Sequence, residues 1–110
     1  MNPMVHKLEQ LLASGKDTAL LRYTLGKAYA DDGQPSVALA HLQQATAQDP
    51  AYSVAWKLLG KVHHALGDAA AARQAWDQGL RCAQARGDAQ VVKELQVFLR
   101  RLDQQAAAEG

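Results

Sequence analysis

The sequence repeats itself with a period of 34 residues, and this repeat constrains the fold more than any other feature. A shift of 34 residues superposes Leu25 and Gly26 on Leu59 and Gly60. The same shift pairs residues of similar size at most other positions, namely Arg22 with Trp56, Tyr29 with His63, Ala38 with Ala72, Leu42 with Trp76 and Ala45 with Gly79. A period of this length is typical of an array in which each unit stacks on its neighbours to bury its apolar face.

Glycine and proline residues divide the chain into six segments, each with apolar residues at helical spacing. Aromatic residues make up only 5% of the chain, which also favours packed helices over sheets. We therefore expect an all-α protein, with Asp17 as the N-cap of the second helix. The expected helices are Pro3–Ala13, 18–32, Pro35–Gln48, 51–66, Ala69–Arg86 and a last helix that starts after Asp88 and ends in a frayed tail, QQAAAEG.

Both units follow the pattern W-x2-L-G-x2-Y, then an alanine, a bulky residue, a small residue and a proline. The residues that carry it are Leu25, Gly26, Tyr29, Ala38, Leu42, Ala45 and Pro50 in the first unit, and Trp56, Leu59, Gly60, Ala72, Trp76 and Gly79 in the second. The pattern resembles the tetratricopeptide repeat, with departures at Arg22, His63 and Gln84. The resemblance covers nearly the whole chain, is closest to small stand-alone repeat proteins of bacteria, and implies a right-handed superhelix of antiparallel helix pairs.

The repeat and the resemblance together imply a single domain over residues 1–105. Its expected parts are an N-terminal capping helix at 1–16, repeats at 19–52 and 53–86, and a C-terminal capping helix at 88–105, followed by a flexible tail at 106–110. The last helix carries Gln96 at the position that Gly26 and Gly60 occupy in the repeats. We therefore expect no further helix to pack there, so the array ends at this helix.

Gly26 and Gly60 each cost about 1 kcal/mol of helix propensity unless close packing needs the absent side chain. We expect each glycine to lie against a small residue of the next helix, Ala38 or Ala72, while a large neighbour fills the remaining gap. Replacing Gly60 by leucine is therefore expected to overpack the contact.

Composition excludes several kinds of partner. The formal net charge of +1 lacks the basic excess that nucleic-acid binding needs, so no nucleic acid is expected. No apolar stretch approaches the roughly 20 residues of a membrane span, so no membrane insertion is expected. The N-terminal segment carries Glu9 and lacks the apolar run of a secretory signal, and the lone Cys82 has no internal disulfide partner. We therefore expect a cytoplasmic protein.

The chain offers no convincing catalytic or metal-binding group. Asp31 and Asp32 are adjacent, as are His63 and His64, and neighbouring helix residues point in different directions. Cys82 lies among alanines and is interpreted as a small apolar residue rather than a nucleophile. Neither of the common glycine-rich phosphate-binding motifs occurs. We therefore predict no enzyme activity, no cofactor and no metal site.

The resemblance also implies a binding surface, since the first helix of each pair lines the concave side, where the family binds peptides. The residues expected there, on helix faces turned away from the core, are Tyr23, Lys27, Val54, Lys57, Lys61, His64, Lys93, Val97 and Arg100. Five of these nine are basic and none is acidic. They form either the solvated faces of ordinary surface helices or a cationic trough for an acidic segment of another protein.

The leading hypothesis is a non-enzymatic adaptor that binds a peptide segment, an acidic one by preference. Two alternatives stay open, namely a self-associating structural protein and a client-specific chaperone of the secretion type. An enzyme or metal protein that uses His63, His64 or Cys82 is the least favoured. A clamp for a C-terminal carboxylate, which some members of the resembling family have, is not predicted, because Leu58 and Glu94 occupy two of its positions. We expect a monomer, with a homodimer as the alternative.

Overall fold

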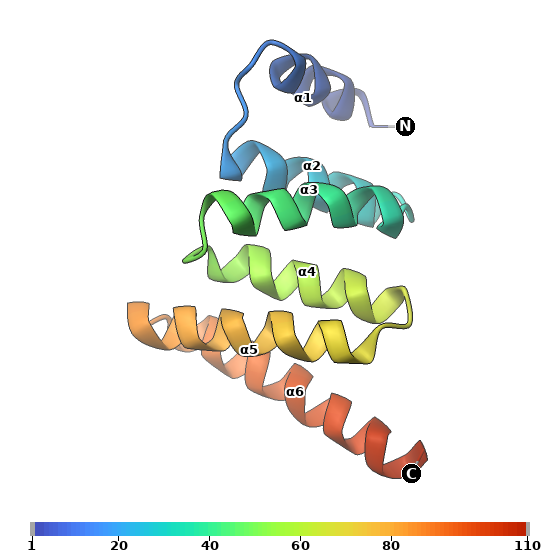
Figure 1. Cartoon of the computed structure of the whole chain (residues 1–110), viewed down its shortest axis with the longest axis vertical. Helices are drawn as coiled ribbons and strands as arrows, with labels where there is room; N and C mark the ends of the chain where they lie inside the picture. The colour runs from blue at the N-terminus through green and yellow to red at the C-terminus, as the bar shows by residue number, and fades with distance from the viewer. Residues whose placement is uncertain (1, 110) are drawn as a thin grey trace.

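The computed structural model describes residues 2–109, and within that range it contains six α-helices and no strand. The helices are α1 (Pro3–Ala13), α2 (Ala19–Asp31), α3 (Pro35–Gln48), α4 (Ser53–Ala65), α5 (Ala69–Arg86) and α6 (Ala89–Glu109). They stack one after another along the longest axis of the molecule, with α1 at one end and α6 at the other (Figure 1). The all-α prediction is confirmed.

Local capping chemistry sets the helix ends, with one difference from the sequence prediction. Thr18, not Asp17, is the N-cap of α2, and its side-chain oxygen accepts a hydrogen bond from the backbone N–H of Leu21 at 3.1 Å. Both residue types cap helices well, but Asp17 is held instead by the side chain of Arg22. Gly87 ends α5 with a left-handed φ of +71°, which glycine adopts without steric cost.

The last helix is longer than predicted. The sequence placed a flexible tail at 106–110, but α6 continues through three alanines to Glu109. Alanine has the highest helix propensity, and neither glycine nor proline interrupts this helix. The final turns also line a surface cleft together with His64 and Arg73, so the end of α6 rests beside the turn that joins α4 to α5.

The hydrophobic core consists of three clusters that follow the stack. The first contains Val5, Leu21 and Leu25, the second Ala38, Leu42, Leu59, Val62 and Ala75, and the third Ala72, Trp76, Ala83, Val91, Leu95 and Leu102. Helices that are neighbours in sequence therefore share most of the core, as in other repeat arrays. The two end helices contribute unequally, since α1 buries one residue and α6 buries three.

The two repeat glycines allow close packing of α2 on α3 and of α4 on α5. A Cβ atom added to Gly26 would lie 2.6 Å from Cγ of Leu42, and one added to Gly60 would lie 2.2 Å from Nε1 of Trp76. The large residue that the sequence placed in the neighbouring gap, Leu42 or Trp76, supplies the atoms nearest to each glycine. The large side chain itself lies across the glycine, and the absence of a Cβ atom makes the room for it.

The stack is narrower on the side formed by α2, α4 and α6. Helix α4 lies against both α2 and α6, whereas the second helices of the pairs, α3 and α5, do not meet within the described range. Close contacts on one side and none on the other curve the array toward α2, α4 and α6. We call this side the concave face.

Candidate functional site

Tyr23 and Val54, two of the residues predicted at the binding surface, take part in packing between helices. The ring of Tyr23, on α2, packs on the ring of Tyr52 with 5.2 Å between their centroids. Tyr52 directly precedes α4, so this pair of rings joins two successive first helices. Val54 is half-buried and packs against the third core cluster.

Two of the five predicted basic groups are paired with carboxylates. Lys27 Nζ donates a hydrogen bond to Asp31 Oδ2 at 2.9 Å, one turn further along α2, and this bond raises the pKa of Lys27. Lys57 Nζ donates to Glu94 Oε1 at 3.1 Å, across the contact between α4 and α6. None of the nine predicted residues is acidic, but Asp31 and Glu94 lie beside them and offset the charge of Lys27 and Lys57.

Lys61 and His64 lie above aromatic rings at the junction of α4, α5 and α6. Lys61 Nζ is 5.7 Å from the centroid of the Phe98 ring, which is a cation–π contact. Phe98 packs in turn on Trp76, with 5.3 Å between the ring centroids. His64 Nε2 lies 3.1 Å from Gln105 Oε1, so its ring is held at the edge of this aromatic group.

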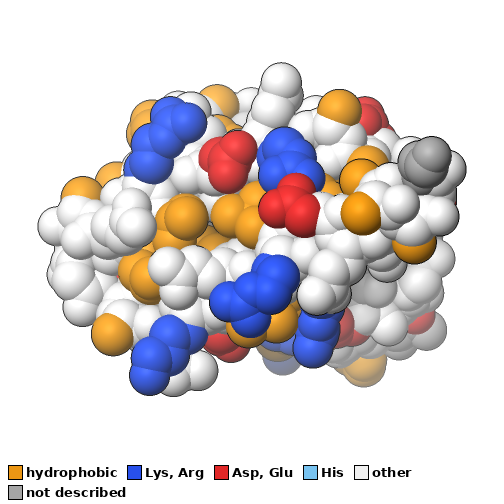
Figure 2. Space-filling view, turned by 90° about the horizontal axis from the view of Figure 1, so that it is seen from below, with side chains coloured by type: hydrophobic (Ala, Val, Ile, Leu, Met, Phe, Trp, Pro, Cys, Tyr) orange, Lys and Arg blue, Asp and Glu red, His pale blue; other side chains and the backbone are white. Residues whose placement is uncertain are grey.

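Lys93, Val97 and Arg100 continue the surface along α6. Lys93 and Arg100 are exposed, and neither makes an ion pair with any other residue from 2 to 109. Val97 is half-buried between them. Figure 2 looks onto the α6 end of the molecule and shows Lys and Arg side chains around a band of hydrophobic ones, with Asp and Glu side chains among them. Charge at this end is therefore mixed, with positive groups on both sides of an apolar strip.

Sequence reasoning missed four residues that lie beside the predicted surface residues: Tyr52, Phe98, Arg101 and Gln105. Phe98 belongs to the apolar stripe of α6, but the structure leaves it half-buried and in contact with Lys61. Arg101 and Gln105 follow Phe98 at helical spacing, so they lie on the same face of α6. That spacing is the signal that could have found them.

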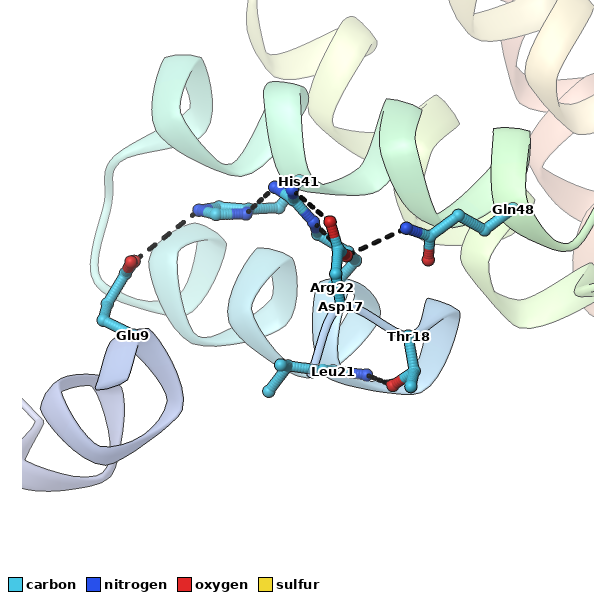
Figure 3. A network of polar contacts seen from close by, with 7 residues as sticks. All are labelled: Glu9, Asp17, Thr18, Leu21, Arg22, His41 and Gln48. Carbon is cyan, nitrogen blue, oxygen red and sulfur yellow. Dashed lines mark hydrogen bonds and ion pairs between the residues drawn. The ribbon is translucent and has the colours of Figure 1, made fainter. Parts of the chain in front are cut away.

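A second group of polar side chains, which we call the N-terminal network, joins α1, α2 and α3 (Figure 3). The guanidinium of Arg22 donates to both carboxylate oxygens of Asp17 at 2.8 Å, and Gln48 Nε2 donates to Asp17 Oδ1 at 2.8 Å. On its other side, Arg22 Nη1 lies 3.2 Å from His41 Nδ1. His41 Nε2 is 3.7 Å from Glu9 Oε1, which brings α1 into the network.

The network shifts the pKa of two of its members. Hydrogen bonds from Arg22 and Gln48 lower the pKa of Asp17 to about 2. Burial lowers the pKa of His41, although Glu9 opposes the shift. A neutral ring can accept a hydrogen bond from Arg22 through Nδ1, so the geometry also favours the neutral form. Because these groups bind one another across three helices, the network holds α1, α2 and α3 together.

Arg22 occupies in the first unit the position of Trp56 in the second, and the two residues have comparable roles. Trp56 Nε1 donates to the carbonyl oxygen of Pro50 at 2.8 Å, in the segment just before α4. Arg22 binds Asp17, in the segment just before α2. Each residue therefore ties its own helix to the connection that precedes it.

No three His, Cys, Asp or Glu side chains come together as metal ligands in the part of the chain that the structure describes. Cys82 is half-buried, and its Sγ lies 3.2 Å from the carbonyl oxygen of Pro50. Among residues 2–109, no helix is both long enough and apolar enough to cross a membrane.

Antiparallel helix pairs, a 34-residue period and a glycine at the helix crossing within each repeat define a protein built from stacked two-helix repeats. A family model described as tetratricopeptide repeat matches residues 23–89. The chain belongs to the tetratricopeptide repeat family, a non-catalytic fold whose members mediate binding between proteins.

Relatives and solved structures agree with this assignment. A TPR repeat-containing protein of Pseudomonas aeruginosa is 56% identical over 91% of this chain and 95% of its own length. The solution structure of a protein from Bordetella parapertussis is 58% identical, with a TM-score of 0.85 over 99% of this chain and 95% of that one. A tetratricopeptide repeat domain protein from Salinibacter ruber is 25% identical, with a TM-score of 0.74 over 79% of this chain and 97% of that one. This chain is therefore similar to small bacterial proteins of the family.

Proposed function

We propose that the protein is a non-enzymatic adaptor that binds an acidic segment of another protein along its concave face. The observation that carries the proposal is a group of cations without a carboxylate partner within residues 2–109, which are Lys61, Lys93, Arg100 and Arg101. They lie on α4 and α6, beside a half-buried aromatic ring and Val97. Like-signed exposed charges attract an oppositely charged segment and guide its approach.

The same surface would serve a chaperone for one client, because an adaptor and a chaperone differ in what is bound rather than in how it is bound. Since the cations are exposed, their attraction for a partner is screened by salt over a distance of about 10 Å at 0.1 M ionic strength. Affinity is therefore expected to fall as salt is added. The proposal includes a cytoplasmic location, which the lone Cys82 favours.

The test is a selection of random linear peptides, displayed on phage, against the immobilised protein at low ionic strength. The selected peptides are expected to carry net negative charge. Reversal of two cations in a Lys61→Glu, Lys93→Glu variant is expected to weaken binding of the corresponding synthetic peptides about tenfold or more. A Lys7→Glu, Lys16→Glu variant is the matched control, because both lysines are exposed near α1, outside the proposed surface.

Two results would contradict the adaptor proposal. Selected peptides of neutral or positive charge would show that the unpaired cations do not define the ligand. Equal affinity of the wild type and the Lys61→Glu, Lys93→Glu variant for an acidic peptide would place binding elsewhere. Circular dichroism of each variant checks that helicity is retained, since exposed charge changes away from the core have small effects on stability.

A further inference from the structure

A cleft of about 310 Å³ opens where α4, α5 and α6 meet. Its main lining residues are Lys61, His64, Trp76, Phe98, Arg101 and Gln105. Only Lys61 and His64 among them were expected at a binding surface. The cleft is therefore lined largely by residues that the predicted trough did not include, and one side chain of a ligand can pack in it.

The floor of the cleft is aromatic and firmly held. Trp76 is only 4% exposed, and its indole N–H donates to the carbonyl oxygen of Lys57 at 3.0 Å. Phe98 packs on Trp76 at 5.3 Å between centroids but remains half-buried, so part of its ring faces the cleft. Burying this exposed apolar surface under a ligand is favourable in proportion to the area removed from water.

The rim of the cleft is positive. Lys61 and Arg101 supply two cations, and no carboxylate is among the lining residues. Two acidic groups of α6, Glu94 and Asp103, are paired with Lys57 and Arg73. The charge at the rim therefore favours an anionic ligand and is not cancelled by the protein itself.

We propose that this cleft recognises an aromatic side chain flanked by carboxylates in a peptide of another protein. This inference rests on the proposed function and names the motif that the concave face selects. The aromatic ring packs on Phe98, and the flanking carboxylates pair with Lys61 and Arg101. An acidic segment without an aromatic residue leaves the floor exposed to water, and an apolar segment without carboxylates desolvates the cations without compensation.

The experiment titrates the protein with three acetylated, amidated peptides and follows binding by NMR and calorimetry. The peptides are Glu-Glu-Phe-Glu-Glu, the same sequence with Ala for Phe, and the same sequence with Gln for every Glu. The chain contains two tryptophans, so two indole N–H signals report on position. Trp76 lines the cleft, whereas Trp56 donates its indole N–H to Pro50 and lies outside it.

We expect the phenylalanine peptide to move the indole signal of Trp76 and to leave that of Trp56 in place. The alanine and glutamine peptides are each expected to bind about tenfold more weakly, and an Arg101→Glu variant is expected to weaken the phenylalanine peptide by a similar factor. Arg81→Glu, an exposed position on α5 outside the cleft, is the matched control and should leave affinity unchanged.

The outcomes separate this inference from the function on which it rests. If the phenylalanine and alanine peptides bind equally and the Trp76 signal does not move, the aromatic cleft is refuted while acidic binding on the concave face stands. If no acidic peptide binds here or in the phage selection, both are refuted. If the Arg101→Glu variant loses affinity but the alanine peptide binds as well as the phenylalanine peptide, the cations at the rim bind the carboxylates and Phe98 contributes nothing. The proposed motif is then wrong.

Discussion

Gly60 sets the distance between α4 and α5 by having no side chain. The ring of Trp76 lies where a Cβ atom would be, and its indole N–H is fixed by a hydrogen bond to Lys57. Gly26 stands in the same relation to Leu42, but the branched end of a leucine can rotate away more easily than an indole ring. The two glycines therefore tolerate a methyl group differently.

Gly60→Ala is expected to lower the free energy of unfolding by about 1 to 3 kcal/mol through overpacking, which exceeds its gain in helix propensity. Gly26→Ala is expected to cost less, because Leu42 can adjust. Urea unfolding followed by circular dichroism measures both, with Lys61→Ala as the exposed control on α4. Equal midpoints for Gly60→Ala and Lys61→Ala would show that this glycine is not needed for close packing.

His41 gives the protein a stability that depends on pH. Burial lowers its pKa from the ordinary value of 6.5. The unfolded chain therefore takes up a proton first as the pH falls through 6.5, and stability drops until the pKa of the folded state is passed. We expect the urea midpoint to decrease over this window in the wild type and to decrease less in His41→Gln. His6→Gln, an exposed substitution on α1, should retain the wild-type dependence; if it loses as much as His41→Gln, the assignment to His41 fails.

At the scale of the element, α1 is held by few contacts. Its buried side chain is Val5, and its polar anchor is Glu9, which accepts a hydrogen bond from the Tyr29 hydroxyl at 2.9 Å and faces His41. Elements with little buried apolar surface open locally at a low free-energy cost. We therefore treat α1 as the least firmly attached helix of the stack.

Glu9→Ala is expected to speed amide hydrogen exchange throughout α1 while leaving α4 and α5 unchanged. The reason is that the substitution removes the acceptor of Tyr29 and the carboxylate beside His41 without touching Val5. Gln10→Ala is the matched control, because Gln10 is exposed on the same helix. Exchange that rises equally in both variants, or that rises across the whole molecule, would argue against a local anchor.

The sequence predicts the helices well, because residues close to each helix end determine where the helix begins and ends. Glycine, proline and apolar spacing mark six helices, and the 34-residue shift identifies the pairs. The features that the sequence does not predict depend on contacts between residues that are distant along the chain. Asp17 and Thr18 are both good caps, and the choice between them is made by Arg22 and Gln48, which hold Asp17 elsewhere. Likewise, Lys57 meets Glu94 only because α6 docks on α4 at one particular rotation.

For the whole molecule, stability is distributed unevenly along the stack. The third core cluster joins α5 to α6 and includes the large side chains of Trp76, Leu95 and Leu102. The first cluster, at the other end, is smaller and depends on Val5 from α1. In an array of this kind, stability is close to a sum of unit and interface contributions, so the two ends should not be equally dispensable.

A chain shortened to start at residue 17 is expected to stay folded with a modest loss of stability, whereas one shortened to end at residue 87 is expected to lose cooperative unfolding. Removal of α6 uncovers the buried Ala72, Trp76 and Ala83, whereas removal of α1 uncovers the buried Leu21 and Leu25 and the partly buried Ala28 and Tyr29. Circular dichroism melting curves of the two shortened chains make the comparison. Similar melting temperatures would mean that the α5–α6 cluster does not dominate.

The two ways of tying a repeat to the connection before it differ in how much they depend on other residues. Trp56 binds a backbone carbonyl, which every residue type at position 50 provides. Arg22 binds a side chain, so it requires an acidic residue at position 17. Single substitutions at position 50, before α4, should therefore leave the hydrogen bond of Trp56 possible. Positions 17 and 22, in contrast, are expected to change together among relatives. Robustness to mutation thus differs between two repeats that share one backbone design.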